Sequence, residues 1–416
     1  MDNLQNSFVI LIYRDMSRYG GIESIAINLI KNCEENYIDA ALICDTSNTI
    51  DEARDLLTFD VQTILKNNIS QIIPKILTKE NIKIIALGPW AGAFGVLFAH
   101  RLLREKLKSK INFAIGVFHP REFNLEHEAN HQHMLNFLFA RLVGNKYLYF
   151  MNTECKMTHE RFLRSSFKNN IVLPIPVKYK KLEWRCQATS KRLKIVCIGR
   201  IVPFKAYNFS LPFIVNYLQK CGIDVQCDIY GHGSHEANLL VEIEKHNVNN
   251  YVKFKGLVPL EKFEETVIKY DLFLGMGLSA IQAAQLGVPT ILAIDQEPEY
   301  CFGYFYQAPP GNVGENNISI PRYKIVDILF NFAKLDNYER NELSKKCAQA
   351  TKIFSINTYI TNIFNNKTSE VTSIGYIQYL YCNLYNKLSN ENDKIRRFAR
   401  FLKRIKTKKL IFWRGV

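Results

Sequence analysis

The sequence predicts an α/β protein with two Rossmann-like, doubly wound domains, each built on a parallel sheet. Short apolar runs such as Val9–Tyr13 and Ile195–Ile198 alternate with helix-like segments along most of the chain. This alternation is typical of parallel sheets that are covered on both faces. Several of the runs end in glycine turns that open a helix. With 416 residues, the chain is also longer than one hydrophobic core usually supports, which favours two domains.

The first domain is expected over residues 1–178, with a strand for each short apolar run. These strands are predicted at Val9–Tyr13, Ala40–Cys44, Ile82–Leu87, Phe113–Phe118, Tyr147–Met151 and Ile171–Leu173. A Gly20-Gly21 turn after the first strand leads into a predicted helix over 22–32. Residues 178–192 are polar and charged without an apolar period, so this stretch is the predicted linker.

The second domain is expected over residues 190–352 and repeats the same alternation. Its predicted strands are 195–198, 225–230, 252–254, 272–274 and 290–294. Its predicted helices are 208–220, 236–246, 260–269, 279–286, 325–334 and 337–352. Residues 353–392 are expected to form C-terminal helices that could cross back to the first domain. A basic tail follows over 393–416.

The net charge of +15 is concentrated in this tail. Ten Lys or Arg and no acidic residue lie between Lys394 and Arg414, which accounts for two thirds of the surplus. Apolar residues recur there at helical spacing: Ile395, Phe398, Phe401, Leu402 and Ile405. A basic amphipathic helix of this kind is typical of segments that lie on an anionic membrane surface. The alternatives are docking on a partner and binding of nucleic acid, but the rest of the chain has no groove-binding motif.

The sequence favours a cytoplasmic protein. Its first residues lack the charged start and the cleavage site of a signal peptide. No apolar run approaches the ~20 residues that span a bilayer. The ten cysteines are scattered without a C-x-x-C pair, which favours reduced thiols in the core over disulfides or zinc ligands. With the basic tail, these features predict a peripheral protein on the inner face of the cell membrane.

Two strand-turn-helix units in the second domain indicate an anion-binding site. In the first, a strand ending at Ile198 is followed by Gly199-Arg200 and, five positions on, by Lys205. In the second, strand 272–274 is followed by Gly275-Met276-Gly277 and a helix of small residues. Helix N-termini and neighbouring cations favour anions. Two such units predict a diphosphate ligand, and a nucleotide-sugar is the first candidate.

The order and spacing of these motifs resemble those of the family 4 glycosyltransferases, which have the GT-B fold. The matching segments are Gly199-Arg200…Lys205, Ile229-Tyr230-Gly231-His232-Gly233, Val252-Lys253-Phe254-Lys255-Gly256 and Gly275-Met276-Gly277…Gln282-Ala283…Gly287-Val288-Pro289. Tyr19-Gly20-Gly21-Ile22-Glu23 stands where that family has its Gly-Gly loop. The resemblance covers roughly residues 8–365. It implies two domains that face a cleft holding a nucleotide-sugar donor, with a UDP-sugar favoured.

The resemblance also implies roles for single residues. Arg200 and Lys205 would hold the two phosphates and stabilise the departing diphosphate as its negative charge grows. Gly20 and Gly21 would let the backbone approach the donor, because a Cβ there would block it. The further implied donor contacts are Gly199, Gly231, Gly233, Gly256, Leu257, Gly275, Met276, Gly277, Ser279 and Gln282.

His119 is the candidate catalytic residue of the first domain. It ends a strand, and open α/β sheets bind ligands at the carboxyl ends of their strands. Related transferases often have a histidine near the donor sugar at this position. Arg121 and Glu122 follow and could touch an acceptor. A metal is also conceivable at His127, His131, His133, Glu126 and Glu128, but no further ligand is near in sequence. We therefore expect a solvated polar face and no metal.

The chain departs from the family at its Glu-x7-Glu motif, where Leu274 and Gln282 stand. In the family, the second Glu binds the ribose hydroxyls. The amide of Gln282 can still accept a hydrogen bond, but neutral hydrogen bonds are about half as strong as charge-assisted ones. Leu274 cannot accept a hydrogen bond at all, so the sequence leaves the affinity for the nucleotide-sugar donor undetermined.

The sequence as a whole predicts a retaining, metal-independent glycosyltransferase without a cofactor. Its acceptor would be a growing cell-surface polysaccharide or a lipid-linked glycan. One alternative is a catalytically degenerate GT-B protein that binds a glycan or a partner subunit. The other is a peripheral membrane scaffold whose function resides in the basic tail.

Overall fold

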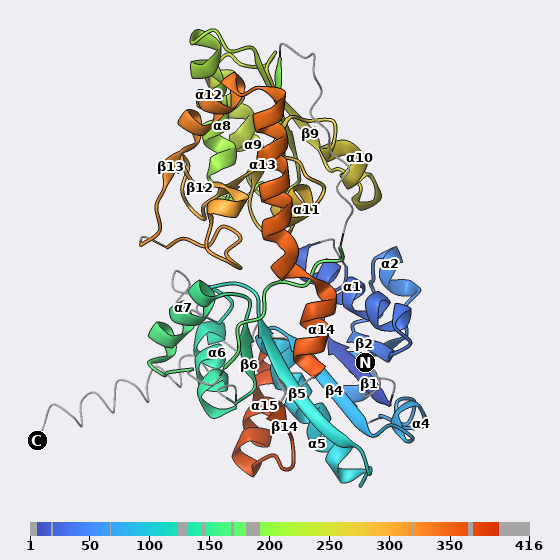
Figure 1. Ribbon diagram of the computed structural model, residues 1–416. Helices are drawn as coiled ribbons and strands as arrows, with labels where there is room; N and C mark the ends of the chain where they lie inside the picture. Colours follow the sequence, from blue (N-terminus) through green and yellow to red (C-terminus); the bar gives the residue numbers. More distant parts are fainter. Residues whose placement is uncertain are drawn as a thin grey trace, which may run out of the picture. The chain divides into compact units, whose positions relative to one another are not determined.

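The computed structural model divides the chain into two compact units (Figure 1). Unit 1 comprises residues 1–174 and 359–416, and unit 2 comprises residues 175–358. The structure describes residues 6–17, 20–66, 68–123, 131–143, 146–167, 170–179, 192–317, 319–364 and 369–390.

Unit 1 is built on a seven-stranded, mostly parallel sheet. Its strands are β1 (Ser7–Ile12), β2 (Asp39–Cys44), β3 (Thr58–Asp60), β4 (Asn81–Leu87), β5 (Lys110–Val117), β6 (Leu148–Phe150) and β14 (Ser369–Glu370). The strand order is β14-β5-β4-β1-β2-β3, β6 also pairs with β5, and β14 is antiparallel to β5. Every residue of β1 is buried, as expected for a central strand that is covered on both faces.

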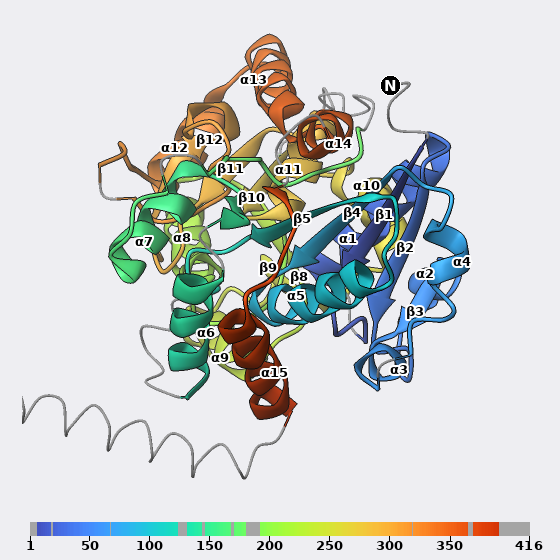
Figure 2. The same ribbon diagram turned by 90° about the horizontal axis from the view of Figure 1, so that it is seen from below.

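The helices of unit 1 cover both faces of this sheet. They are α1 (Gly21–Glu35), α2 (Asp51–Arg54), α3 (Val61–Leu65), α4 (Ile73–Ile76), α5 (Pro89–Arg104), α6 (His131–Leu142), α7 (Thr153–Leu163) and α15 (Tyr376–Asn390). Helix α14 (Ile356–Phe364) crosses the boundary between the units. Seen from below, α15 lies against α5 and α6 (Figure 2). The segment from Tyr359 onward therefore completes unit 1 rather than unit 2.

Unit 2 has its own seven-stranded sheet, in the order β13-β12-β11-β10-β7-β8-β9. The strands are β7 (Leu193–Ile198), β8 (Val225–Tyr230), β9 (Val252–Gly256), β10 (Leu272–Gly275), β11 (Thr290–Ala293), β12 (Tyr300–Tyr304) and β13 (Tyr323–Lys324). The helices are α8 (Tyr207–Lys220), α9 (Glu236–Lys245), α10 (Phe263–Val267), α11 (Leu278–Gln285), α12 (Ile325–Lys334) and α13 (Asn337–Ala350). Strands β7 to β11 are parallel, and β12 and β13 extend one edge in the antiparallel direction.

The predicted fold class is confirmed, and most strands lie within one to three residues of their predicted bounds. Several elements differ. The helix expected over 260–269 is a short 3-10 turn followed by α10, and the strand expected over 171–173 is only a bridge between Val172 and Phe150. Strands β3, β12, β13 and β14 were not predicted. The expected linker lies mostly outside the described residues.

The nine cysteines in the described part of the chain are free, and eight of them are buried, which agrees with the expected reduced core thiols. Among the described residues, no helix combines the length and the apolar character that crossing a bilayer requires.

Each sheet has a point at which the winding direction reverses, and open α/β sheets bind ligands there. In unit 1 this point lies between β1 and β4, and in unit 2 between β7 and β10. In unit 2, Phe273 pairs with Val196, so two residues further on Gly275 lies level with Ile198. The two predicted anion-binding turns, after β7 and after β10, are therefore neighbours.

Candidate functional site

The ammonium group of Lys205 lies directly over the backbone of Gly199. A Cβ at Gly199 would be 2.5 Å from Lys205 Nζ, so glycine is the residue that leaves room for the lysine here. Lys205 is buried, and burial, followed by the positive charge of Arg200, lowers its pKa to about 8. The Lys205 N–H donates to the carbonyl of Val202 at 3.0 Å, which closes the loop around the lysine. The loop thus presents a buried cation at the carboxyl end of β7.

Arg200 supplies a second cation beside it. Its side chain is exposed, and its guanidinium lies 5.7 Å from the ring centroid of Phe204. A buried ammonium and an exposed guanidinium together can meet two phosphate groups, one as a point charge and one as a planar fork. Both belong to the short loop between β7 and α8, which is also joined to the loop after β11 by a hydrogen bond from Gln296 N–H to Phe204 O (2.8 Å).

Gly231 and Gly233, after β8, allow a close backbone approach to the β7 loop. A Cβ at Gly231 would lie 1.9 Å from the carbonyl oxygen of Gly199, and one at Gly233 would lie 2.1 Å from that of Ile201. Gly231 also has φ of 154° and donates its N–H to Gly256 O at 2.7 Å. The predicted glycines after β7, β8 and β9 therefore form one connected group. Contact of these residues with a donor stays a prediction.

The turn after β10 is fixed by hydrogen bonds to neighbouring parts of unit 2. Gly277 has φ of 76° and donates its N–H to Val313 O at 2.7 Å. Ser279 donates its hydroxyl to Ile198 O at 2.8 Å, which ties the first turn of α11 to the end of β7. The hydroxyl of Ser279 thus ties the N-terminus of α11 to the end of β7, so the positive end of the helix dipole lies beside the loop that carries the two cations.

Leu274 and Gln282, the two positions that the sequence comparison aligned with Glu-x7-Glu, are both buried. Leu274, a residue of β10, has no exposed surface and belongs to the core. Gln282, on α11, is 9% exposed. Leu257 is different, because it is 72% exposed just after β9. These three positions keep their sequence-based roles as predictions.

A buried carboxylate stands beside this turn, and sequence reasoning assigned it no role. Glu315 Oε2 accepts the N–H of Val313 at 2.8 Å, and the carbonyl of Val313 accepts from Gly277. Asn312 braces the same loop, since its Oδ1 accepts from Gly314 N–H at 2.8 Å and its Nδ2 donates to Glu315 O at 3.0 Å. The available sequence signal was an Asn-Val-Gly-Glu run in a loop rich in glycine and proline.

In unit 1, the predicted Gly20-Gly21 loop lies beside a Tyr–Glu pair. Tyr13 donates its hydroxyl to Glu23 Oε1 at 2.8 Å, and a Cβ at Gly20 would collide with the same carboxylate, 2.3 Å from Oε2. Burial, followed by the charge of Glu23, raises the pKa of Tyr13. A Cβ at Gly21 would meet no atom within 4 Å, so packing does not require that glycine. Tyr19 lies outside the described residues.

His119 and Glu122 lie together after β5. His119 Nδ1 accepts the N–H of Arg121 at 3.0 Å, which assigns the proton of a neutral ring to Nε2. Glu122 Oε2 accepts the N–H of Phe118 at 2.5 Å, and Oε1 would be 2.7 Å from a Cβ at Gly88. Burial raises the pKa of Glu122 to about 7. A carboxyl with such a pKa near the predicted catalytic histidine is a candidate for proton transfer or for acceptor binding.

The metal alternative gains no support from the described residues. Among them, no group of three or more possible ligands is found. The His133 ring packs against Phe162, with ring centroids 4.9 Å apart. Glu126, His127 and Glu128 lie outside the described residues, as does the basic tail from Lys394 to Arg414. The expectation of a polar face and of no metal therefore stays a prediction.

Comparisons with solved structures identify the fold. A point mutant of S. aureus TarM, in a complex with UDP, fondaparinux and α-GlcNAc-glycerol, matches with a TM-score of 0.59 at 14% identity, over 86% of this chain and 100% of that chain. WaaB, a lipopolysaccharide outer core galactosyltransferase, matches with a TM-score of 0.54 at 16% identity, over 87% and 98%. The pneumococcal O-GlcNAc transferase GtfA, with UDP and GlcNAc, gives 0.54 at 11% identity, over 86% and 98%.

These neighbours are GT-B glycosyltransferases, and the protein has the GT-B fold. Its two α/β units, each with a mostly parallel sheet, are those of this class. No family model and no curated protein matches the sequence.

Proposed function

We propose that the protein transfers a sugar from a nucleotide-diphosphate sugar, with UDP favoured as the nucleotide, to a glycan or a lipid-linked glycan. The observation that carries this proposal is the buried ammonium of Lys205, held over Gly199 and beside Arg200 at the reversal point of the unit 2 sheet. A buried cation is costly in a folded protein, and binding of an anion offsets that cost. The neighbouring N-terminus of α11 favours the same anion.

Under this proposal, the two cations act on the leaving group. The nucleotide diphosphate gains negative charge as the bond to the sugar breaks, and a preorganised ammonium and guanidinium stabilise that charge. The departing phosphate oxygen takes the proton of the acceptor hydroxyl on the same face, so that the anomeric configuration is retained without a metal. His119 and Glu122 of unit 1 are the candidate contacts to the sugar and the acceptor.

The acceptor class and the place of action are inferred from two sources. WaaB acts on the lipopolysaccharide outer core, and the TarM complex contains a GlcNAc-glycerol. The basic segment from Lys394 to Arg414 would hold the enzyme on an anionic membrane surface, where a lipid-linked acceptor resides. We therefore place the reaction in cell-surface polysaccharide synthesis, on the cytoplasmic face of the membrane.

One second candidate has an observation in its favour. Leu274 is fully buried and Gln282 is neutral, so neither family carboxylate is present. A degenerate GT-B protein that binds a glycan or a partner subunit would fit this loss. It predicts that no nucleotide stabilises the protein. A membrane scaffold that acts only through its tail predicts that Arg200→Ala has no effect in the cell.

Thermal unfolding in the presence of UDP, GDP, ADP or CMP tests the proposal. A ligand at about 100 times its Kd adds about 2.7 kcal/mol, which raises Tm by several degrees. We expect one nucleoside diphosphate to stabilise the wild type and not Arg200→Ala or Lys205→Met. Lys269→Ala is the matched control, because Lys269 is an exposed lysine of unit 2 that pairs with Glu265. Stabilisation of all four proteins alike, or of none, would contradict the proposed donor site.

A further inference from the structure

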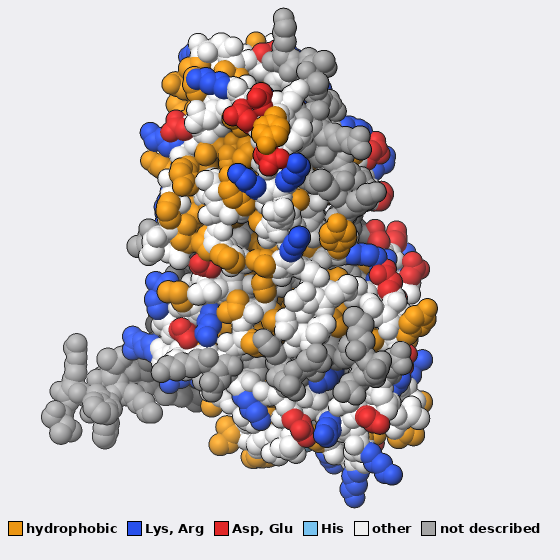
Figure 3. Space-filling model, in the orientation of Figure 1, with side chains coloured by type: hydrophobic (Ala, Val, Ile, Leu, Met, Phe, Trp, Pro, Cys, Tyr) orange, Lys and Arg blue, Asp and Glu red, His pale blue; other side chains and the backbone are white. Residues whose placement is uncertain are grey.

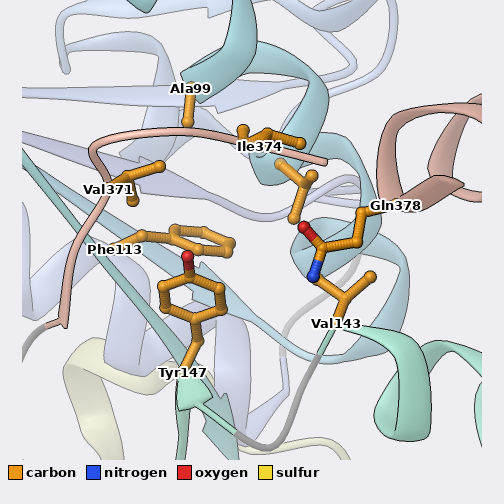
Figure 4. A pocket seen from close by; sticks show the side chains of 8 residues that line it. Ala99, Phe113, Val143, Tyr147, Val371, Ile374 and Gln378 are labelled. Carbon is orange, nitrogen blue, oxygen red and sulfur yellow. The ribbon is translucent and has the colours of Figure 1, made fainter. Parts of the chain in front are cut away.

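Unit 2 has a cavity of about 480 Å³ between the N-terminal parts of α8 and α9, which lie side by side (Figure 1). This volume lies within the ~300–1,000 Å³ of typical small-molecule sites. Its lining includes Pro203, Phe209, Ala237, Asn238, Val241 and Glu242. By contrast, the cavity between Phe113, Tyr147 and Gln378 in unit 1 has only about 10 Å³, no more than one water molecule requires (Figure 4).

The walls of the unit 2 cavity are fixed by contacts within that unit. His235, the residue before α9, also lines the cavity, and its N–H donates to the carbonyl of Ile201 at 3.2 Å. Its Nδ1 lies 2.9 Å from the hydroxyl oxygen of Ser234. Its ring centroid lies 6.3 Å from that of Phe209, with 66° between the ring planes. The two rings therefore form adjoining aromatic walls of one preformed cavity.

The lining of the cavity favours an uncharged ligand. No lysine or arginine lines it among the described residues. Glu242 pairs with Lys245, with 3.0 Å between Oε1 and Nζ, and Glu236 in the first turn of α9 offsets the positive end of that helix. Figure 3 shows acidic and basic side chains interspersed over one face of the molecule. Charge therefore singles out no binding region on that face, and the shape and chemistry of the cavity carry the inference.

The cavity combines apolar surfaces with a few polar groups. Phe209 is half-buried and Val241 is exposed, and both present apolar surface to the cavity. The exposed amide of Asn238 can donate and accept hydrogen bonds, and the carboxylate of Glu242 can accept them. Pyranose sugars have an apolar C–H face that packs on aromatic rings and a rim of hydroxyl groups that needs such polar partners.

We propose that this cavity binds an uncharged saccharide unit. It is distinct from the donor site, because Arg200 and Lys205 are not among its described lining residues. Pro203 nevertheless belongs to the loop that carries both cations, so the saccharide would lie at the same end of unit 2. Under the proposed function, on which this role rests, the saccharide is a non-reacting unit of the growing glycan. Its binding would hold the acceptor chain on the enzyme between transfers.

Saturation-transfer NMR on the full-length protein tests the proposal with three uncharged probes: maltotriose, N-acetyllactosamine and chitotriose. We expect at least one probe to bind the wild type, and Ala237→Trp, which fills the cavity, to lower its affinity about tenfold or more. Phe209→Leu should act in the same direction, because it removes the aromatic face. Leu240→Trp is the matched control, since Leu240 is a 46% exposed α9 residue that is not among the described lining residues. The control should bind like the wild type, and circular dichroism should show all proteins folded.

Hydrogen exchange of the wild type gives a readout that is independent of substitution. The probe that binds should protect backbone amides at 206–209 and 237–242. Binding of none of the three probes, or equal binding by Ala237→Trp and the wild type, would overturn the proposal. No nucleotide is present, so the result is separate from the thermal unfolding with UDP. Stabilisation by UDP without saccharide binding would overturn the saccharide site alone, and the reverse result would contradict the donor site alone.

Discussion

Lys205 Nζ occupies the space that a side chain at Gly199 would need, since a Cβ there would lie 2.5 Å from the nitrogen. Glycine at position 199, just after β7, is therefore explained by the position of the lysine as well as by the turn. It allows a lysine five positions past Arg200 to fold back over the strand end. Gly199 and Lys205 therefore depend on each other, because the ammonium group can take this position only while residue 199 has no side chain.

The first prediction concerns this Gly199–Lys205 pair. Gly199→Ala should displace the ammonium group without breaking the fold, because the colliding atom is the end of a flexible side chain. We expect the affinity for the nucleoside diphosphate to fall about tenfold or more, with a loss of stability below about 1 kcal/mol. Calorimetric titration and urea unfolding measure the two effects. Gly375→Ala is the control, because a Cβ there meets its nearest neighbour at 3.5 Å. Unchanged affinity in Gly199→Ala would separate Lys205 from the ligand.

A second prediction follows from the lysine pKa, which falls from 10.5 to about 8 in the folded protein. Because the folded value is the lower one, the unfolded chain binds more protons, and stability should rise as pH increases from 8 to 10.5. At pH 7 the charged, buried lysine lowers stability, so Lys205→Met should raise Tm while it abolishes nucleotide binding. A lower Tm for Lys205→Met would contradict the conclusion that the buried charge destabilises the folded protein.

The same pKa predicts proton uptake on binding. Above pH 8 a large share of Lys205 is neutral, and a bound diphosphate would raise its pKa and recharge it. Calorimetric titrations with UDP at pH 8.5, in two buffers of different ionisation enthalpy, should therefore show protons taken up from the buffer. The Lys205→Met variant should show none. Buffer-independent heats for the wild type would mean that the ammonium is not a ligand.

The third prediction concerns Glu315, whose carboxylate holds Val313 and, through it, Gly277. Glu315→Ala leaves the buried Val313 N–H without its acceptor, which costs about 1–3 kcal/mol. We expect the turn at Gly277 to shift and the affinity for the nucleoside diphosphate to fall about tenfold. Glu315→Gln keeps an acceptor and should restore most of the affinity. Glu297→Ala, which breaks a pair with Arg322 elsewhere in the same region, should lower stability alone. Wild-type affinity in Glu315→Ala would leave the loop a purely structural role.

The elements that the sequence predicted well are those whose pattern is local. Buried parallel strands such as β7 and β10 contain continuous apolar runs, and the glycine turns at 199 and 275–277 mark the ends of these two strands. Strand β12 has no such signal, because Cys301-Phe302-Gly303 is short, contains glycine and pairs antiparallel at the sheet edge. The helix expected over 260–269 is a 3-10 turn over Leu260–Lys262 followed by α10, because the apolar spacing of the sequence does not distinguish i→i+3 from i→i+4 hydrogen bonding.

The sequence predicted the charged residues of the candidate site but not the contacts between its residues. The cations at 200 and 205 were evident, whereas the reason for Gly199 depends on how a lysine folds back. The collision of Gly231 with Gly199 joins residues 32 positions apart, and no spacing rule reveals it. The raised pKa of Glu122 likewise depends on burial beside Gly88, which comes from a different strand end.

Gly231 gives the fourth prediction. A Cβ there would lie 1.9 Å from a backbone oxygen, which cannot move as a side chain would. Gly231→Ala should therefore cost more than about 2 kcal/mol, from backbone displacement and from the φ of 154° together. Gly222→Ala is the control, because Gly222 has φ of 80° but open space around its Cα. Its cost should stay near 1 kcal/mol in urea unfolding. Equal costs in the two variants would mean that the collision is relieved without strain.

The last prediction uses Glu122, whose pKa rises from 4.5 to about 7 on folding. Because the folded value is the higher one, the native state binds more protons between these values. The contribution of the neutral carboxyl to stability is therefore complete below pH 4.5 and is lost as pH rises to 7. Glu122→Gln mimics the neutral form and still offers an acceptor for the Phe118 N–H. We expect this variant to be more stable than the wild type at pH 8 and equally stable at pH 4.5. If Glu122→Gln lowers stability at both pH values, the carboxylate is charged in the native protein and accepts hydrogen bonds that an amide cannot replace.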